Sequence, residues 1–386
     1  MKKIVQAWTG ISLVQRIVAG LVIGALLGMF VPSEGGIAIL GDVFVGALKA
    51  IAPLLVFFLV ISSLCYAGKS HGGVIRTVII MYMFSTFLAA IVAVTASSAF
   101  PVTLTLVDAA TDMAAPQGVA EVLRTLLMNV VTNPVQSLVS ANYIGILVWA
   151  VLIGIALRKA SDTTKQSLND ISAALSKTVT WIIQCAPFGI MGLVYNTVSV
   201  NGLSTFTEYG KLLAVLLGSM LFIYFVTNPI LVFWCIRKNP YPLIFKCLKK
   251  SAITAFFTRS SAANIPINME ACAEMGLDKD TYSVTIPLGA TINMDGAAIT
   301  ITVMTLAAAH TLGIAVDIPS AIILSILATL SACGASGVAG GSLLLIPMAC
   351  SLFGISNDIA MQIVGIGFII GVIQDSVETA LNSAGD

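Results

Sequence analysis

The stretch SACGASGVAGGS, residues 331–342, interrupts an otherwise apolar run over 318–353. The stretch TRSSAAN, residues 258–264, interrupts the run 243–270 in the same way. The apolar arms beside each small, polar tip are shorter than the about 20 residues that a spanning helix needs. Irregular backbone at membrane depth is tolerated only where protein or a water-filled cavity satisfies it. Both runs are therefore predicted to be re-entrant helical hairpins, and such paired interruptions indicate a transporter substrate site.

The composition places these hairpins in a membrane protein. Of the 386 residues, 58% are hydrophobic and 10% are charged, whereas soluble domains carry about 25% charged residues. Disorder is excluded because it needs low hydrophobicity. The 19 basic and 18 acidic residues leave no basic field for nucleic acid. The seven scattered cysteines show neither a metal-site nor a disulfide pattern. The class that remains is an all-α polytopic membrane protein.

About eight apolar segments are predicted to cross the bilayer: 11–31, 43–67, 74–101, 142–158, 171–200, 211–236, 281–312 and 357–385. Lys and Arg gather at the ends of alternate segments, as at Lys2, Lys3 and Arg158, and acidic residues such as Asp108 prevail at the others. The positive-inside rule therefore predicts a cytoplasmic N-terminus and external loops at 102–118 and 201–209.

Ionisable residues inside the spans indicate function, because each costs at least ~2.5–3.5 kcal/mol on insertion scales. The segment 281–312 contains Asn293, Asp295 and Gly296. They offer two side-chain oxygens and a glycine where the helix can unwind and free its carbonyls. Oxygen ligands suit a hard cation such as Na⁺. A hydrogen-bonded kink in a bundle interior is the alternative.

Five polar residues of the last segment lie on one helical stripe, with spacings of 3, 4, 7 and 11 from the first: Asp375, Glu378, Thr379, Asn382 and Asp386. The three carboxylates need compensation, and Arg259 in the first hairpin tip is the one intramembrane cation predicted in this half. The alternative is an exposed chain end, which the strongly apolar stretch 359–373 disfavours.

Hydroxyl groups at two other places are weaker candidates. Ser260 and Ser261 stand at a broken helix end, where donors suit a carboxylate, although they could simply cap a helix. Tyr82, Ser85 and Thr86 lie in the third segment, where Ser and Thr often bond back to their own helix. No catalytic sequence motif accompanies these residues, so an enzyme is not expected.

Four motifs, in this order, resemble the dicarboxylate/amino acid:cation symporter family, also called the glutamate transporter family: TRSSAANIP at 258–266, TINMDGAA at 291–298, ASGVAGGS at 335–342 and DSVETALNSAGD at 375–386. The resemblance spans nearly the whole chain. It implies a sodium-coupled homotrimer in the bacterial inner membrane, made of eight spanning helices and two hairpins.

The resemblance also implies two domains. Scaffold helices one and two would lie in 1–70, and scaffold helices four and five in 102–209. An elevator-like transport domain would combine helix three in 71–101 with helix six, both hairpins, helix seven and helix eight in 210–386.

Site roles follow from the same resemblance. Asp375 would bind the substrate amino group, Asn382 and the Ser260–Ser261 tip the α-carboxylate, Thr379 would assist, and Gly337 and Val338 would close over the substrate. One sodium site would use Asp386 with carbonyls of Gly289, Asn293 and Asn382. A second would use carbonyls of Thr291 and Met294 with second-hairpin backbone. A third would use Asn293, Asp295, Tyr82, Ser85 and Thr86.

The departures from the family pattern bear on the substrate. Carriers of acidic amino acids have an arginine where Glu378 stands and a threonine where Ala297 stands. Because Glu378 would repel an acidic substrate, a neutral one is predicted, and its hydroxyl could donate to Glu378, which favours serine and threonine. Ala339 replaces a proline common in the second hairpin tip. Arg259 is expected to pair with Asp375 or Glu378, since an unpaired buried charge is costly.

Three other functions stay open at this point. An acidic amino acid or dicarboxylate symporter of the same family is supported by Arg259 and opposed by Glu378. An anion-conducting channel would show uptake without accumulation. A membrane receptor or structural protein would show no transport, and the polar stripe of the last segment argues against it.

Overall fold

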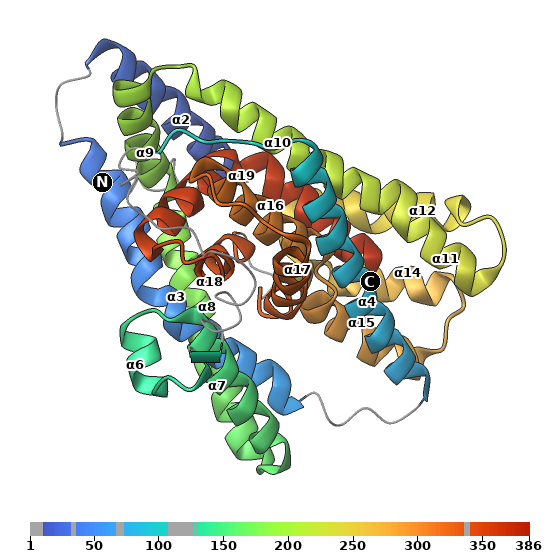
Figure 1. Cartoon of the computed structure of the whole chain (residues 1–386). Helices are drawn as coiled ribbons and strands as arrows, with labels where there is room; N and C mark the ends of the chain where they lie inside the picture. Colours follow the sequence, from blue (N-terminus) through green and yellow to red (C-terminus); the bar gives the residue numbers. More distant parts are fainter. Residues whose placement is uncertain (1–10, 32–35, 67–72, 107–126, 129, 336–339) are drawn as a thin grey trace.

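The computed structural model describes residues 11–31, 36–66, 73–106, 127–128, 130–335 and 340–386, and every regular element among them is helical (Figure 1). The first half contains α2 (Leu13–Phe30), α3 (Ala38–Tyr66), α4 (Gly73–Ala99), α6 (Pro134–Val139), α7 (Tyr143–Ala156), η1 (Leu157–Lys159), α8 (Asp162–Gln184) and α9 (Ala186–Asn201).

The second half begins with α10 (Thr205–Phe222), the π-helical turn η2 (Ile223–Thr227) and α11 (Asn228–Ile236). It continues with α12 (Tyr241–Cys247), η3 (Leu248–Ala252), α13 (Ile253–Thr258), α14 (Ser261–Glu274), α15 (Lys279–Ile292), α16 (Asp295–Thr311), α17 (Ile318–Ala332), η4 (Ser342–Leu345), α18 (Ile346–Ser351) and α19 (Asn357–Gly385).

Six helical stretches of the described chain are long and apolar enough to cross a membrane: α2, α3, α4, Thr205–Ile236, Lys279–Thr311 and α19. The predicted single segment 171–200 needs correction, because it consists of the end of α8 and of α9, which are bent by 56°. Pro187 in the first turn of α9 suits a helix start. The predicted span 142–158 contains the 14-residue α7, which is shorter than a full span.

Both interrupted runs are hairpin-like in the structure, as the sequence predicts. In the first, α12 to α13 form one arm and α14 forms the other. Arg259 reverses the chain between them with a positive φ of 52°, a conformation that non-glycine residues rarely adopt. In the second, α17 and the η4–α18 pair form the arms. The tip residues 336–339, which include Gly337 and Val338, lie outside the described residues.

The predicted unwinding within 281–312 is also present. Helix α15 ends at Ile292, Asn293 and Met294 have non-helical backbone angles, and α16 begins at Asp295. Because α16 starts in the protein interior, its first N–H groups need partners from other elements.

The helices pack into two groups. Helices α2, α3, α7, α8 and α9 pack together in one group. In the other group α4 contacts α10, α15, α16 and α17, and α16 and α19 contact most of the remaining helices. In Figure 1 the blue and green helices of the first group lie to one side of the orange and red helices. A Cβ atom at Gly24 would lie 2.4 Å from the backbone oxygen of Met191, so α2 and α9 touch through their backbones, as small residues allow in membranes.

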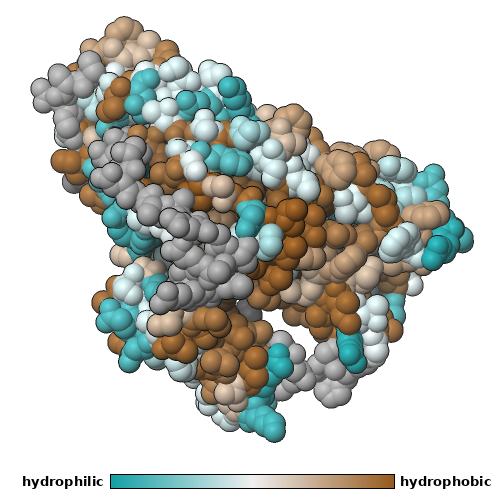
Figure 2. Space-filling view, viewed as in Figure 1, coloured by the Kyte–Doolittle hydropathy of each residue, from teal (hydrophilic) through white to brown (hydrophobic). Residues whose placement is uncertain are grey.

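The outer surface is strongly hydrophobic. Figure 2 shows brown residues over much of the visible helical face. Large apolar side chains such as Phe257 and Trp234 are 76% and 64% exposed. Exposed apolar area of this extent needs a non-aqueous neighbour, which for a polytopic helical protein is the hydrocarbon core of the bilayer.

Candidate functional site

Arg259 and Asp375 form a buried ion pair between the first hairpin and α19. Arg259 Nε donates to Asp375 Oδ2 over 2.6 Å, and the two side chains are 11% and 4% exposed. The other carboxylate oxygen accepts a bond of 3.1 Å from the backbone N–H of Gly340. Asp375 therefore joins both hairpins to α19. Of the two partners expected for Arg259, Asp375 and Glu378, the structure shows Asp375.

Glu378 occupies the next position on the same stripe, and one of its oxygens carries a dense set of hydrogen bonds. Its Oε2 accepts from Gln374 Nε2 at 2.5 Å, from Thr300 Oγ1 at 2.7 Å and from Ser342 Oγ at 2.9 Å. These donors come from α19, α16 and the second hairpin. They stabilise a negative charge where a cation stands in acidic-substrate carriers of the family that the sequence resembles.

The side chain of Asn382 provides a hydrogen-bond partner for the backbone at the start of α16. Its Oδ1 accepts a bond of 2.7 Å from the N–H of Gly296, while its Nδ2 faces Met294 Sδ at 3.4 Å. Sulfur is a weak acceptor, so the amide Nδ2 retains donor capacity for a stronger partner. The close approach needs glycine, since a Cβ atom at Gly296 would lie 2.9 Å from Glu378 Cα.

The hydroxyls beside this centre have local partners. Ser260 caps α14, because its Oγ accepts from the N–H of Ala263 over 3.3 Å. Thr379 Oγ1 donates to the carbonyl of Asp375 one helical turn back, over 2.8 Å. Ser261 is buried at the first position of α14. Helix starts of this kind present N–H groups that can bind an anionic group.

A second polar cluster surrounds Asp295. Ser85 Oγ donates to its Oδ2 over 2.7 Å, and Thr86 Oγ1 lies 3.2 Å from its Oδ1. Thr86 also contacts the carbonyl of Tyr82 at 2.9 Å. Asp295 is 1% exposed, so three residues from α4 and α16 that the sequence assigns to one ion site do come together.

Asp386 lies at the centre of a third cluster. Its Oδ1 and Oδ2 lie 3.4 Å from the side-chain amides of Asn293 and Asn268, respectively. Tyr82 Oη donates to the backbone oxygen of Asp386 over 3.0 Å. A Cβ atom at Gly289 would lie 2.8 Å from Asp386 Oδ1, so a larger residue there would displace that carboxylate.

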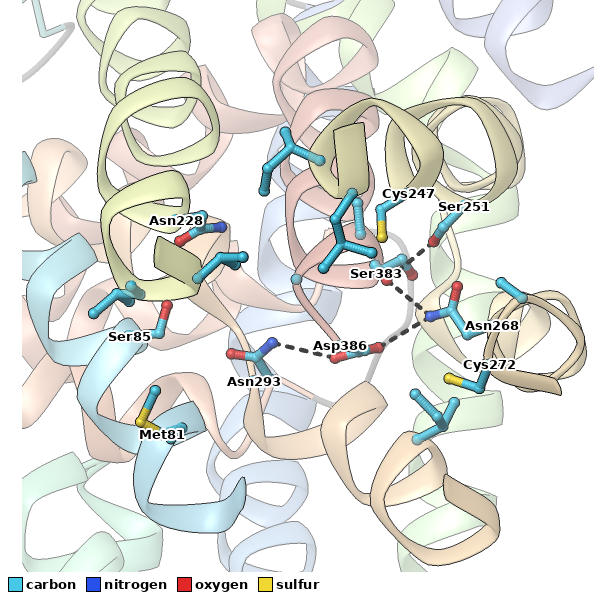
Figure 3. A pocket seen from close by; sticks show the side chains of 18 of the residues that line it. Met81, Ser85, Asn228, Cys247, Ser251, Asn268, Cys272, Asn293, Ser383 and Asp386 are labelled. Carbon is cyan, nitrogen blue, oxygen red and sulfur yellow. Dashed lines mark hydrogen bonds between the residues drawn. The ribbon is translucent and has the colours of Figure 1, made fainter. Parts of the chain in front are cut away.

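Residues of the last two clusters line one cavity of about 340 Å³ (Figure 3). Figure 3 shows Ser85, Asn228, Asn293 and Asp386 around it. Among the described residues, the ion pairs are Lys49–Asp358, Lys250–Glu274 and Arg259–Asp375, so neither Asp295 nor Asp386 has a basic partner there. The Oδ1 atom of Asn293 is buried and has no hydrogen-bond partner among the residues that the structure describes.

This donor set fits a hard monovalent or divalent cation. It consists of carboxylate, amide and hydroxyl oxygens, the ligand types that hard cations prefer. A buried carboxylate without a basic partner, as at Asp295, is costly unless a positive charge compensates it. The orphaned Asn293 oxygen would gain a partner from the same ion.

The remaining predicted residues are less closely involved. Thr291 has an exposed side chain whose hydroxyl bonds back to the carbonyl of Leu288 at 2.7 Å. The carbonyl of Gly289 accepts from the N–H of Asn293 over 2.8 Å. Met294 is buried against Asn382. The Thr291 side chain lies outside the clusters, while the predicted role of the Thr291 carbonyl in a sodium site stays a prediction.

Several residues of the site are absent from the sequence-based prediction. Gln374, Thr300 and Ser342 bind Glu378, and Asn268 binds both Asp386 and the carbonyl of Ser383, the latter over 2.8 Å. Of these residues, Gln374 could have been predicted from the sequence, because it precedes Glu378 by one helical turn. Thr300 carries no such signal, since a buried threonine in a long apolar helix is usually packing or back-bonding.

The chain is similar to known proteins over nearly its whole length. The model of the family described as "Sodium:dicarboxylate symporter family" matches residues 13–386. A protein of Streptococcus thermophilus named serine/threonine transporter SstT is 57% identical over 387 residues, covering 100% of this chain and 96% of the relative. A Streptococcus agalactiae protein of the same name is equally similar. One of Bifidobacterium adolescentis is 56% identical, and 90% of its length is covered.

Proposed function

Because the chain belongs to the sodium:dicarboxylate symporter family, we propose that it is a sodium-coupled importer of small neutral amino acids, with serine and threonine as preferred substrates. The name of its full-length relatives supports this substrate class. The observation that carries the proposal is Glu378, a buried carboxylate held by three donors at the position where a side-chain carboxylate of an acidic substrate would need a cation.

The amino acid would bind between the two hairpins and α19. The start of α14 at Ser260 and Ser261, together with Asn382 Nδ2, supplies donors for the α-carboxylate. Asp375 supplies a carboxylate for the amino group, and Thr379 stands one turn further on. The three donors all bond to Glu378 Oε2, which leaves Oε1 as the oxygen to accept from a substrate. A substrate hydroxyl that donates to Oε1 would favour serine and threonine over alanine.

The acidic-substrate alternative loses its main support. Arg259 is the cation that could have received a second carboxylate, and Asp375 already neutralises it over 2.6 Å. An acidic side chain would have to displace Asp375 and also approach Glu378. Like charges in such a site cost several kcal/mol.

Sodium ions would bind at the Asp295 cluster and at the Asp386 cluster. Each ion that enters with the substrate gains ~2.3 kcal/mol per 100 mV of membrane potential. The ligands at the Asp295 cluster would be Tyr82, Ser85, Thr86, Asn293 and Asp295. At the Asp386 cluster they would be Asp386 and carbonyls of Gly289, Asn293 and Asn382, and carbonyls of Thr291 and Met294 would serve a further site. Asn293 lies between the two clusters, which supports coupling between them.

We further propose an elevator-type mechanism in a homotrimer. The helices that pack around α19 and α16 would move as one body against the group formed by α2, α3, α7, α8 and α9. The division of packing into these two groups supports the mechanism. The trimer rests on the family resemblance.

Uptake by proteoliposomes tests the function directly. The wild-type chain is offered radiolabelled serine, threonine, alanine and aspartate, with and without an inward sodium gradient. We expect sodium-dependent accumulation of serine and threonine that excess aspartate does not inhibit. Concentrative aspartate uptake would contradict the role of Glu378, and uptake that never exceeds equilibrium would indicate a channel.

A variant pair then tests the ion site. Asp295→Asn keeps the shape of the side chain but removes its charge, so we expect at least a tenfold rise in the sodium concentration for half-maximal serine uptake. Asp280→Asn, at an exposed position of α15, is the matched control and should leave it unchanged. An unaltered sodium dependence in Asp295→Asn would contradict the assignment.

A further inference from the structure

A groove of about 950 Å³ lies between α4 and α10, away from the polar centre. Small residues line much of it, namely Ala96, Ala99, Ala214 and Gly218. The neighbouring apolar side chains face outward, since Phe100 is 68% exposed and Phe222 is 48% exposed. Figure 1 shows the end of α4 beside α10. The groove therefore opens on a membrane-facing surface.

The length of the groove matches one leaflet of a bilayer. Along α10 its lining runs from Lys211 to Phe222. At about 1.5 Å of rise per residue this distance is about 16 Å. The hydrocarbon core is about 30 Å thick, so one leaflet contributes about 15 Å. An acyl chain of one lipid could extend along the groove from end to end.

Lys211 places a positive charge at one end of this apolar groove. It is exposed, and it has no acidic partner in the part of the chain that the structure describes. Glu208, one turn earlier, is engaged elsewhere, because its two oxygens accept from the N–H and the hydroxyl of Thr105 at 2.7 and 2.9 Å. A long lysine side chain near a helix end can reach the head-group layer.

We propose that this groove binds one anionic glycerophospholipid, with its head-group phosphate on Lys211 and one acyl chain between α4 and α10. Basic groups beside grooves between membrane helices are suited to anionic head groups. The two helices belong to the same packing group, so the lipid would stay with that group. On the charge distribution of the loops, the leaflet would be the outer one.

Two glycines of α10 provide a matched test. A Cβ atom at Gly218 or at Gly210 would meet none of the described atoms within 4 Å, so a larger side chain at either position starts without a clash. Only Gly218 lines the groove. Gly218→Leu therefore fills the groove, and Gly210→Leu on the same helix is the control. Lys211→Ala removes the charge and leaves the groove open.

The measurement is native mass spectrometry of the purified full chain, delipidated and then titrated with phosphatidylglycerol or with phosphatidylcholine. We expect the wild type to retain one phosphatidylglycerol per protomer in preference to phosphatidylcholine. Lys211→Ala should reduce that preference about fivefold, the effect of about one surface lysine on anionic lipid. Gly218→Leu should lose the retained lipid, and Gly210→Leu should keep it.

Other outcomes would overturn the proposal. Equal retention of phosphatidylglycerol in Gly218→Leu and Gly210→Leu would mean that the lipid binds elsewhere. An unchanged preference in Lys211→Ala would remove the role of the charge. Equal retention of both lipids by the wild type would refute the anionic head group. Loss of a protein oligomer, and not of lipid, in Gly218→Leu would show that a second copy of the chain occupies the groove.

Discussion

Two buried threonines on α16 differ only in their partners. Thr300 and Thr302 are both fully buried. Thr300 Oγ1 donates to Glu378 and accepts from Gln374 Nε2 at 2.7 Å, whereas Thr302 Oγ1 has no hydrogen-bond partner in the described part of the chain. The same residue type in the same helix therefore performs a polar role at one position and fills space at the other.

Valine substitutions separate these two roles. Thr300→Val should lower stability by about 1.5–3 kcal/mol, because a hydrogen bond to a charged group is lost. Thr302→Val should be neutral or stabilising, because an unsatisfied hydroxyl is removed from the interior. Thermal unfolding in detergent measures both. A larger loss of stability in Thr302→Val than in Thr300→Val would contradict the hydrogen-bond network around Glu378.

At the scale of elements, the start of the second hairpin is set by a charged cap. Asp317 precedes α17, and its Oδ1 accepts from the N–H of Ser320 over 2.9 Å. Hydrogen bonds from the side chain and backbone of Ser320 hold the pKa of Asp317 below its usual value of 3.8. A lowered pKa in the folded state means that the charged cap stabilises above the unfolded pKa and that this contribution is lost as the pH falls through the folded value.

Asp317→Asn tests the charge, because asparagine also caps helices. The melting temperature of the wild type should exceed that of the variant at pH 6. The difference should shrink as the pH falls below about 4. Asp317→Ala, which removes the cap altogether, should stay below both proteins over the same range. A difference between wild type and Asp317→Asn that is constant from pH 6 to pH 3 would rule out the charge effect.

The contact between α2 and α9 requires a glycine at position 24, whereas the glycine at position 46 has open space around it. At Gly24 a Cβ atom would lie 2.4 Å from a backbone oxygen, whereas at Gly46, within α3, it would meet nothing within 4 Å. Gly24→Ala should therefore destabilise by about 1–3 kcal/mol through overpacking. Gly46→Ala should be neutral or slightly stabilising, because alanine favours helix. Equal melting temperatures for the two variants would show that α2 and α9 can move apart freely.

At the scale of the whole molecule, a few contacts connect the two helix groups. Lys49 on α3 forms an ion pair with Asp358 in the first turn of α19. Phe44 packs edge-on against Phe368, with ring centroids 5.2 Å apart. If the groups move against each other during transport, these contacts must break and re-form.

Cross-linking tests that motion. With the native cysteines replaced, Lys49→Cys with Asp358→Cys, joined by a short bismaleimide, should abolish serine uptake by holding the two groups together. The control pair is Lys250→Cys with Glu274→Cys, which replaces an ion pair of 2.7 Å inside the first hairpin and should keep uptake when cross-linked. Full uptake by the first cross-linked pair would contradict the elevator-type motion.

The residues and spacings alone were enough to predict the membrane class, the two hairpins, the unwound Asn293–Asp295 region and the polar stripe of α19. The reason is that helix length, hydrophobic runs and the 3.6-residue period are local properties. The assignment of individual roles came from the family resemblance, and those roles remain proposals.

The partners of these polar groups depend on how the helices pack in the folded chain. Arg259 pairs with Asp375 across 116 residues and leaves Glu378 to Thr300, which lies 78 residues away. The 56° bend between α8 and α9 was likewise not predicted, because it lies within one apolar segment. Partner choice depends on how helices from distant parts of the chain pack and on which buried donor must satisfy which acceptor. No period or spacing in the sequence encodes that packing directly.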